Sequence, residues 1–152
     1  MIETEASRTA GPKAEALLRA IGGYRRKESM ETPPKVAVVL VVEDEPLLRM
    51  MAAHVVEDAG FEPLEAANAD EAVRVLEARS DIRIVFTDID MPGSMNGMKL
   101  AAAVRSRWPP IGIIVTSGHY NIGADKLPAR GVFFRKPYSD RDIIATLQRM
   151  AA

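Results

Sequence analysis

Runs of apolar residues alternate along the chain with segments in which apolar residues recur every three or four positions. The run VAVVLVV, residues 36–42, is apolar throughout, which is typical of a parallel strand covered on both faces. Pro46 then suits the first turn of a helix, and Gly60 stands where the helical spacing after it ends. This part of the pattern predicts a strand followed by a helix.

The same alternation continues to the C-terminus. Further strands are predicted at FEPLEA, IRIVFT and IGIIVT, residues 61–66, 82–87 and 111–116, and the segment GVFFRKP, residues 131–137, holds a short fifth strand. Helical spacing or capping residues separate them: Asn68 with Glu71 resembles a capping box, and Ser139 suits the start of a last helix. Between Thr116 and Gly131, two glycines and a proline permit only a short or distorted helix. Five strands interleaved with helices predict an α/β fold with a doubly wound parallel sheet.

Residues 1–35 differ from the rest of the chain. Their only helical feature is a brief amphipathic stripe, residues 14–21, which Gly22 and Gly23 end. Composition and position favour a flexible N-terminal extension over residues 1–35, with a short docking helix as the alternative. We therefore expect one compact domain, over residues 36–152.

Composition limits the classes of function. The net charge of −1 gives no field that would attract nucleic acid or an anionic membrane. The 152 residues contain no cysteine, which excludes disulfides and thiolate metal sites, and the longest apolar run is too short to span a bilayer. We expect a soluble cytoplasmic protein that binds neither nucleic acid nor membrane.

Polar residues follow four of the predicted strands. Glu43 and Asp44 follow the first, Asp88 the third, Thr116 with Ser117 the fourth, and Lys136 the fifth. In a parallel α/β sheet these ends share one edge, where ligands bind. Three carboxylates at that edge would repel each other unless a hard cation such as Mg²⁺ lay among them.

Each of these residues also has a simpler interpretation. Acidic residues favour helix N-termini, Asp90 suits an Asx-turn, Thr116 and Ser117 suit a helix cap, and Lys136 suits solvent. Their joint occurrence at four strand ends favours a functional site over these separate roles.

Four motifs, VLVVEDEPLLR, DIDMPGSMNG, IIVTSG and FFRKPY, resemble the signatures of the response-regulator receiver domain of two-component signalling, in family order. The resemblance covers residues 36–152 and implies a flavodoxin-like sheet with strand order 2-1-3-4-5. It also implies that Asp88 accepts a phosphoryl group from a sensor histidine kinase or a phosphotransfer protein. The domain would then be a phosphorylation-dependent switch or relay and not an enzyme.

The resemblance implies a role for each motif residue. Mg²⁺ would be held by Glu43, Asp44, Asp88 and the backbone carbonyl of Asp90. Thr116 and Lys136 would contact phosphoryl oxygens, and Thr116 with Phe133 would form the conformational switch. Such a carboxylate is a competent nucleophile when a metal and an ammonium neutralise the phosphoryl oxygens.

Three features depart from the family pattern. The turn MPGSMNG is one residue longer than usual, the segment GHYNIGADKLPAR is too irregular for a full fourth helix, and Phe133 lacks the hydroxyl of the family's tyrosine. Because the chain ends one helix after Lys136, we expect a single-domain regulator whose output is binding to a downstream protein.

Two alternative functions remain open. In a haloacid-dehalogenase-type phosphohydrolase, Asp88 would be the nucleophile and Asp90 the general acid. That family places its second acidic pair after the lysine, whereas Glu43 and Asp44 come well before Asp88, so the order of residues argues against this function. A receiver-like binding module that is never phosphorylated would use the same fold as a constitutive partner surface.

Overall fold

The computed structural model describes residues 36–152, so the predicted N-terminal extension over residues 1–35 lies outside the described residues. Five parallel strands form one sheet in the order β2-β1-β3-β4-β5, which confirms the predicted flavodoxin-like sheet. The strands are β1 (Val38–Val42), β2 (Glu62–Ala66), β3 (Ile82–Asp88), β4 (Gly112–Ser117) and β5 (Gly131–Arg135). The first strand begins later than its apolar run, because Val36 is 55% exposed and lies before the first paired residue.

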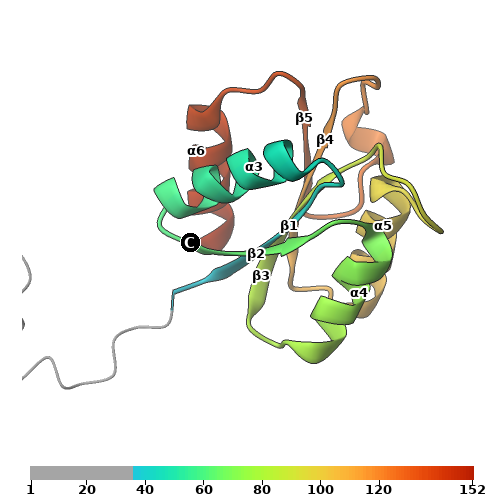
Figure 1. The fold of residues 1–152 in the computed structure, drawn as a ribbon, viewed down its shortest axis with the longest axis horizontal. Coiled ribbons are helices and arrows are strands. Elements are labelled where there is room, and N and C mark those ends of the chain that lie inside the picture. The colour runs from blue at the N-terminus through green and yellow to red at the C-terminus, as the bar shows by residue number, and fades with distance from the viewer. Residues whose placement is uncertain (1–35) are drawn as a thin grey trace, which may run out of the picture. The chain divides into compact units, whose positions relative to one another are not determined.

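Helices cover both faces of the sheet, as Figure 1 shows. They are α3 (Pro46–Asp58), α4 (Ala69–Ala78), α5 (Gly97–Arg107) and α6 (Asp140–Ala151). Successive residues of β1 point to opposite faces, so Val39 and Val41 pack with α3 and α6, whereas Leu40 and Val42 pack with α4 and α5. Burying each such side chain contributes about 1.5–3 kcal/mol, which explains why β1 is apolar throughout.

Local sequence sets the helix ends. Pro46 occupies the first turn of α3, and Gly60 follows that helix with a φ of +92°, which a glycine adopts without strain. At the start of α4 the Asn68 side chain accepts a hydrogen bond from the Glu71 N–H at 2.8 Å, as the capping motif predicts. The Ser139 side chain accepts from the Asp142 N–H at the start of α6.

The connection from β4 to β5 contains only a single 3₁₀ turn, η2 (Ala124–Lys126). This confirms the predicted short or distorted fourth helix. Within the connection Ile122 and Leu127 pack partly against the core, while most of the residues around them are exposed. The ends of β1 and β4, before α3 and before this connection, lie at the same edge of the parallel sheet. Among the described residues, no helix has the length and apolar character needed to cross a membrane.

Candidate functional site

Acidic residues from two strands meet at the carboxyl edge of the sheet. Glu43 and Asp44 follow β1, and Asp88 is the last residue of β3. Each of the three offers one carboxylate oxygen, and these oxygens lie within 4.8 Å of one another. The parallel register explains the meeting, because Val42 pairs with Thr87 and so brings the two strand ends level.

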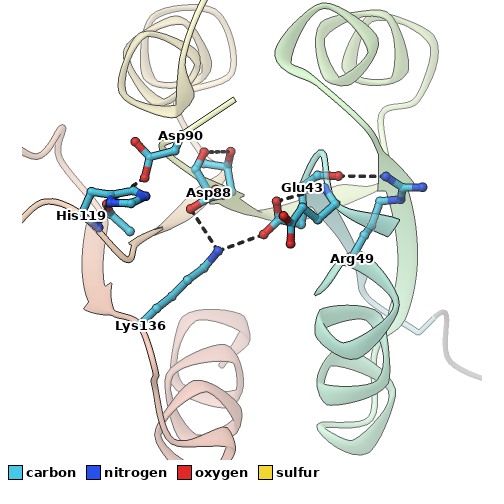
Figure 2. Close-up of polar contacts among 9 residues, drawn as sticks. Glu43, Arg49, Asp88, Asp90, His119 and Lys136 are labelled. Carbon is cyan, nitrogen blue, oxygen red and sulfur yellow. Dashed lines mark hydrogen bonds and ion pairs between the residues drawn. The ribbon is translucent and has the colours of Figure 1, made fainter. Parts of the chain in front are cut away.

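Lys136 joins this acidic group from the end of β5. Its ammonium lies 2.9 Å from Glu43 Oε1 and 3.3 Å from Asp88 Oδ1 (Figure 2). The side chains of Glu43 and Asp88 are each 7% exposed, and that of Lys136 is 25% exposed. Asp88 Oδ1 is buried without a hydrogen bond of acceptable geometry, so this oxygen retains capacity for a ligand.

Burial and charge together shift the pKa values of these three groups. It raises the pKa of Asp88, and the neighbouring Lys136 charge offsets only part of this effect. The pKa of Glu43 is raised for the same reason, against the hydrogen bond from Lys136. For Lys136, burial favours the neutral amine, but the hydrogen bond to Glu43 and the Asp88 charge outweigh it and raise the pKa. The fold therefore gathers carboxylates that are costly to ionise in the absence of a counter-charge.

A hard divalent cation fits this donor set. The available ligands are carboxylate oxygens, which Mg²⁺ prefers, and a single ammonium leaves the group with excess negative charge. Asp88 Oδ1, which lacks a hydrogen-bond partner, is the kind of buried polar atom that a metal or a phosphoryl group would satisfy. A dication would also reverse the effect of burial on the carboxyl pKa values.

Two contacts hold the backbone on which these side chains stand. Arg49, one turn into α3, donates to the Glu43 carbonyl at 2.9 Å and pairs with Glu65 at 3.3 Å. Gly97 donates its N–H to the Ile89 carbonyl at 3.0 Å. A Cβ at Gly97 would collide with the Asp88 carbonyl oxygen and lie 2.7 Å from Ile89 Cα, so a glycine is required there.

Thr116 and Ser117 end β4 beside the acidic group. Thr116 pairs in register with Asp88 and is buried, and it lines the same cavity as Asp88 and Lys136. The Ser117 hydroxyl donates to Asp90 Oδ2 at 3.1 Å and accepts the N–H groups of His119 and Tyr120 at 3.0 Å each. The structure thus brings Thr116 to the site, while the Asp90 side chain turns toward the end of β4.

Phe133 stands apart from the other predicted residues. It is half-buried on β5 beside Val115 and packs against the core formed with α4 and α5. It does not line the cavity that contains Asp88, Thr116 and Lys136. Phe133 instead packs on the side of the sheet covered by α4 and α5. The structure therefore gathers the predicted residues Glu43, Asp44, Asp88, Thr116 and Lys136 without Phe133.

The site opens into an apolar cavity of about 360 Å³ that sequence reasoning missed. Leu48 and Met51 of α3 line it, together with Tyr138, whose ring packs at a tilt against Phe86 with centroids 5.9 Å apart. Burial raises the pKa of Tyr138. Sequence patterns also do not identify Arg49 and Gly97 as residues that hold the backbone of the site. Their only sequence signals are a basic residue one helical turn after the acidic pair and a glycine where a helix begins.

Comparisons with known proteins agree with this geometry. The sequence model of the response regulator receiver domain matches residues 39–148. A response regulator of Rickettsia bellii described as NtrX-like is 33% identical over 116 residues, which are 73% of this chain and 24% of that protein. The sensor kinase CckA of Brucella abortus is 34% identical over 118 residues, which are 75% of this chain and 12% of that protein. The chain thus spans a quarter or less of the length of these curated relatives.

A solved structure supports the same likeness. The receiver domain protein from Clostridium thermocellum superposes with a TM-score of 0.69 at 27% identity, covering 76% of this chain and 94% of that one.

Proposed function

Because the chain belongs to the response regulator receiver domain family of two-component signalling, we propose that Asp88 is its phosphoacceptor and that residues 36–152 form a phosphorylation-dependent switch. Receiver domains are signalling modules and generally not enzymes. The observation that carries the proposal is the buried Asp88 Oδ1, which has no hydrogen-bond partner, lies 3.3 Å from the Lys136 ammonium and belongs to the cluster of carboxylates.

The proposed reaction is transfer of a phosphoryl group from a phosphohistidine to Asp88. An Asp88 oxygen attacks phosphorus, the phosphorus–nitrogen bond breaks, and the imidazole leaves with the electron pair and takes up a proton. Lys136 neutralises one phosphoryl oxygen, and the Thr116 hydroxyl donates a hydrogen bond to another. The transition state is loose, so positioning and charge neutralisation supply most of the acceleration.

Receiver domains bind Mg²⁺ through an acidic pocket, and this chain has such a cluster. We assign the metal to Glu43, Asp44 and Asp88 with the Asp90 backbone carbonyl. When bound, Mg²⁺ would supply the positive charge that lets a buried carboxylate approach an anionic phosphoryl group. Lys136 then no longer has to neutralise Glu43 and Asp88 alone.

The proposed output is a change in a protein-binding surface. Once Asp88 carries a phosphoryl group, Thr116 moves toward it and Phe133 repacks into the vacated space, which is a two-state element biased by a local charge. The β4–β5 connection, residues 118–130, adjoins both residues and is mostly exposed, so it is the proposed surface for a downstream protein. A sensor histidine kinase or a phosphotransfer protein is the proposed phosphodonor.

Two alternative functions use the same residues. Membership of the receiver family leaves the phosphohydrolase alternative without support. The alternative of a binding module that is never phosphorylated predicts that Asp88 stays unmodified.

Intact-mass measurement with acetyl phosphate separates the proposal from that alternative. The wild-type chain should gain one phosphoryl group with Mg²⁺ and none with EDTA, and Asp88→Asn should gain none. Asp58→Asn, which removes an exposed carboxylate at the end of α3, is the matched control and should behave as wild type. An unmodified wild-type protein under these conditions would favour the binding module.

A further inference from the structure

One hydroxyl connects two loops of the site. Ser117 is fully buried, and its hydroxyl makes three hydrogen bonds, to Asp90 Oδ2 and from the N–H groups of His119 and Tyr120. A serine hydroxyl has one donor and two acceptor positions, so its capacity is used in full. Figure 2 shows Asp90 and His119 next to each other at this point.

The two connected loops have different parts in the proposed switch. Asp90 belongs to the loop after β3, and its backbone carbonyl is the proposed Mg²⁺ ligand. His119 and Tyr120 begin the β4–β5 connection, the proposed partner surface. The exposed Arg135 side chain also contacts this connection, at the Asn121 side chain. That contact lies at the surface, where hydrogen bonds contribute least, whereas the Ser117 bonds start from a buried atom.

We propose that Ser117 is a positioning residue that couples Mg²⁺ binding at the Asp90 carbonyl to the order of residues 118–120. The inference rests on the proposed Mg²⁺ site. Holding the Asp90 side chain restricts the rotation of its backbone, and therefore the direction of the carbonyl that would bind the metal. Because the same hydroxyl accepts the His119 and Tyr120 N–H groups, a metal that fixes Asp90 also fixes the start of the connection.

Thermodynamic reciprocity gives the coupling a measurable form. If ordering residues 118–120 favours Mg²⁺ binding, then Mg²⁺ must order these residues by the same factor. Ser117→Ala removes the hydroxyl with little change in volume, so the strand should remain packed. In this variant Mg²⁺ should bind about tenfold more weakly, as when a residue that orients a metal ligand is lost. The Mg²⁺-dependent protection of the His119 and Tyr120 amides should also disappear.

The test uses the full chain and two readouts, calorimetric Mg²⁺ affinity and amide hydrogen exchange with and without Mg²⁺. Asp90→Ala should lower affinity and protection as Ser117→Ala does, and the double variant should be no worse than Asp90→Ala alone. Asp90→Asn retains an acceptor oxygen for Ser117, so it should retain the amide protection and lose only the part of the affinity due to charge. Thr146→Val is the control, because it removes a buried hydroxyl that bonds within α6, far from this loop.

The outcomes distinguish the inference from the function on which it rests. A wild-type chain that binds no Mg²⁺ would overturn the metal site and with it the coupling. If the wild type binds Mg²⁺ and accepts a phosphoryl group, but Ser117→Ala retains wild-type affinity and Mg²⁺-dependent protection, the proposed function stands and the role of Ser117 is wrong. Equal losses in Thr146→Val would likewise refute it, because they would show a general loss of stability.

Discussion

The acidic side of the candidate site and the β4–β5 connection lie next to each other but are held by different forces. Glu43 and Asp88 are buried on strand ends, and Gly97 packs so closely against the Asp88 backbone that no side chain fits. The connection over residues 118–130 contains one 3₁₀ turn and many exposed residues. The comparison sets closely packed, buried strand ends beside an exposed connection. In the proposed function the first would hold the phosphoryl group and the second would be read by a partner.

The largest effect on stability is expected from Gly97→Ala, which should disrupt the close packing of the backbone around Asp88. The added Cβ collides with the Asp88 carbonyl, so backbone must move and the free energy of unfolding should fall by about 2–3 kcal/mol. Mg²⁺ affinity should fall as well, because Asp88 is displaced. Gly118→Ala is the matched control: its Cβ would lie 3.9 Å from the nearest atom, so urea denaturation should give wild-type stability.

Asp88→Asn should stabilise the metal-free protein at neutral pH. A carboxyl whose pKa is higher in the folded than in the unfolded chain binds protons more tightly when folded, as burial dictates for Asp88 and Glu43. The contribution of these groups is therefore most favourable at low pH. It is lost as pH rises from the unfolded pKa through the folded one.

The predicted gain for Asp88→Asn is about 2 kcal/mol at neutral pH, the order of the desolvation penalty of a buried polar group that lacks a hydrogen-bond partner. It should shrink toward zero as the medium is made acidic. Urea denaturation in EDTA across that pH range measures it. A gain that does not depend on pH would contradict the assigned cause.

Asp44→Asn should have a smaller effect of the same sign, because Asp44 is less buried than Glu43 and Asp88. Removing one carboxylate from the cluster should stabilise the metal-free fold by about 1 kcal/mol and weaken Mg²⁺ binding. The two changes are measured by thermal melting in EDTA and by Mg²⁺ titration. Melting below wild type in EDTA would argue against a crowded acidic cluster.

The smallest energies belong to the β4–β5 connection, where local opening should cost little. Amides over residues 118–130 should exchange at least about tenfold faster than those of α3 in the unmodified protein. They should slow when beryllofluoride is added as a phosphoryl mimic. Protection equal to that of α3, unchanged by the mimic, would remove the contrast between the two regions.

Sequence reasoning predicted the features of both regions that depend on local sequence. The apolar strands and the polar residue after each strand are local features, so the sheet edge and the grouping of Glu43, Asp44, Asp88 and Lys136 followed from them. Gly118, Gly123 and Pro128 likewise predicted the missing helix.

The missed features depend on contacts between segments that are distant in sequence. The bond from Ser117 to Asp90 joins residues 27 positions apart, and the apolar cavity forms only when α3 meets the segment after β5. No local sequence pattern predicts this hydrogen bond or this cavity. The same limit applies to Gly97, whose requirement arises from the Asp88 backbone nine residues earlier and not from its place in a helix.

The central claim is that Asp88 is the residue that accepts the phosphoryl group. Reduction with borohydride converts an aspartyl phosphate into homoserine, so peptide mass spectrometry after treatment with acetyl phosphate and Mg²⁺ locates the modified residue. We predict that homoserine is found at position 88, that its formation requires Mg²⁺, and that the Asp88→Asn variant contains none. Homoserine at Asp44 or Asp90 in the wild-type chain, or equal labelling in EDTA, would contradict it.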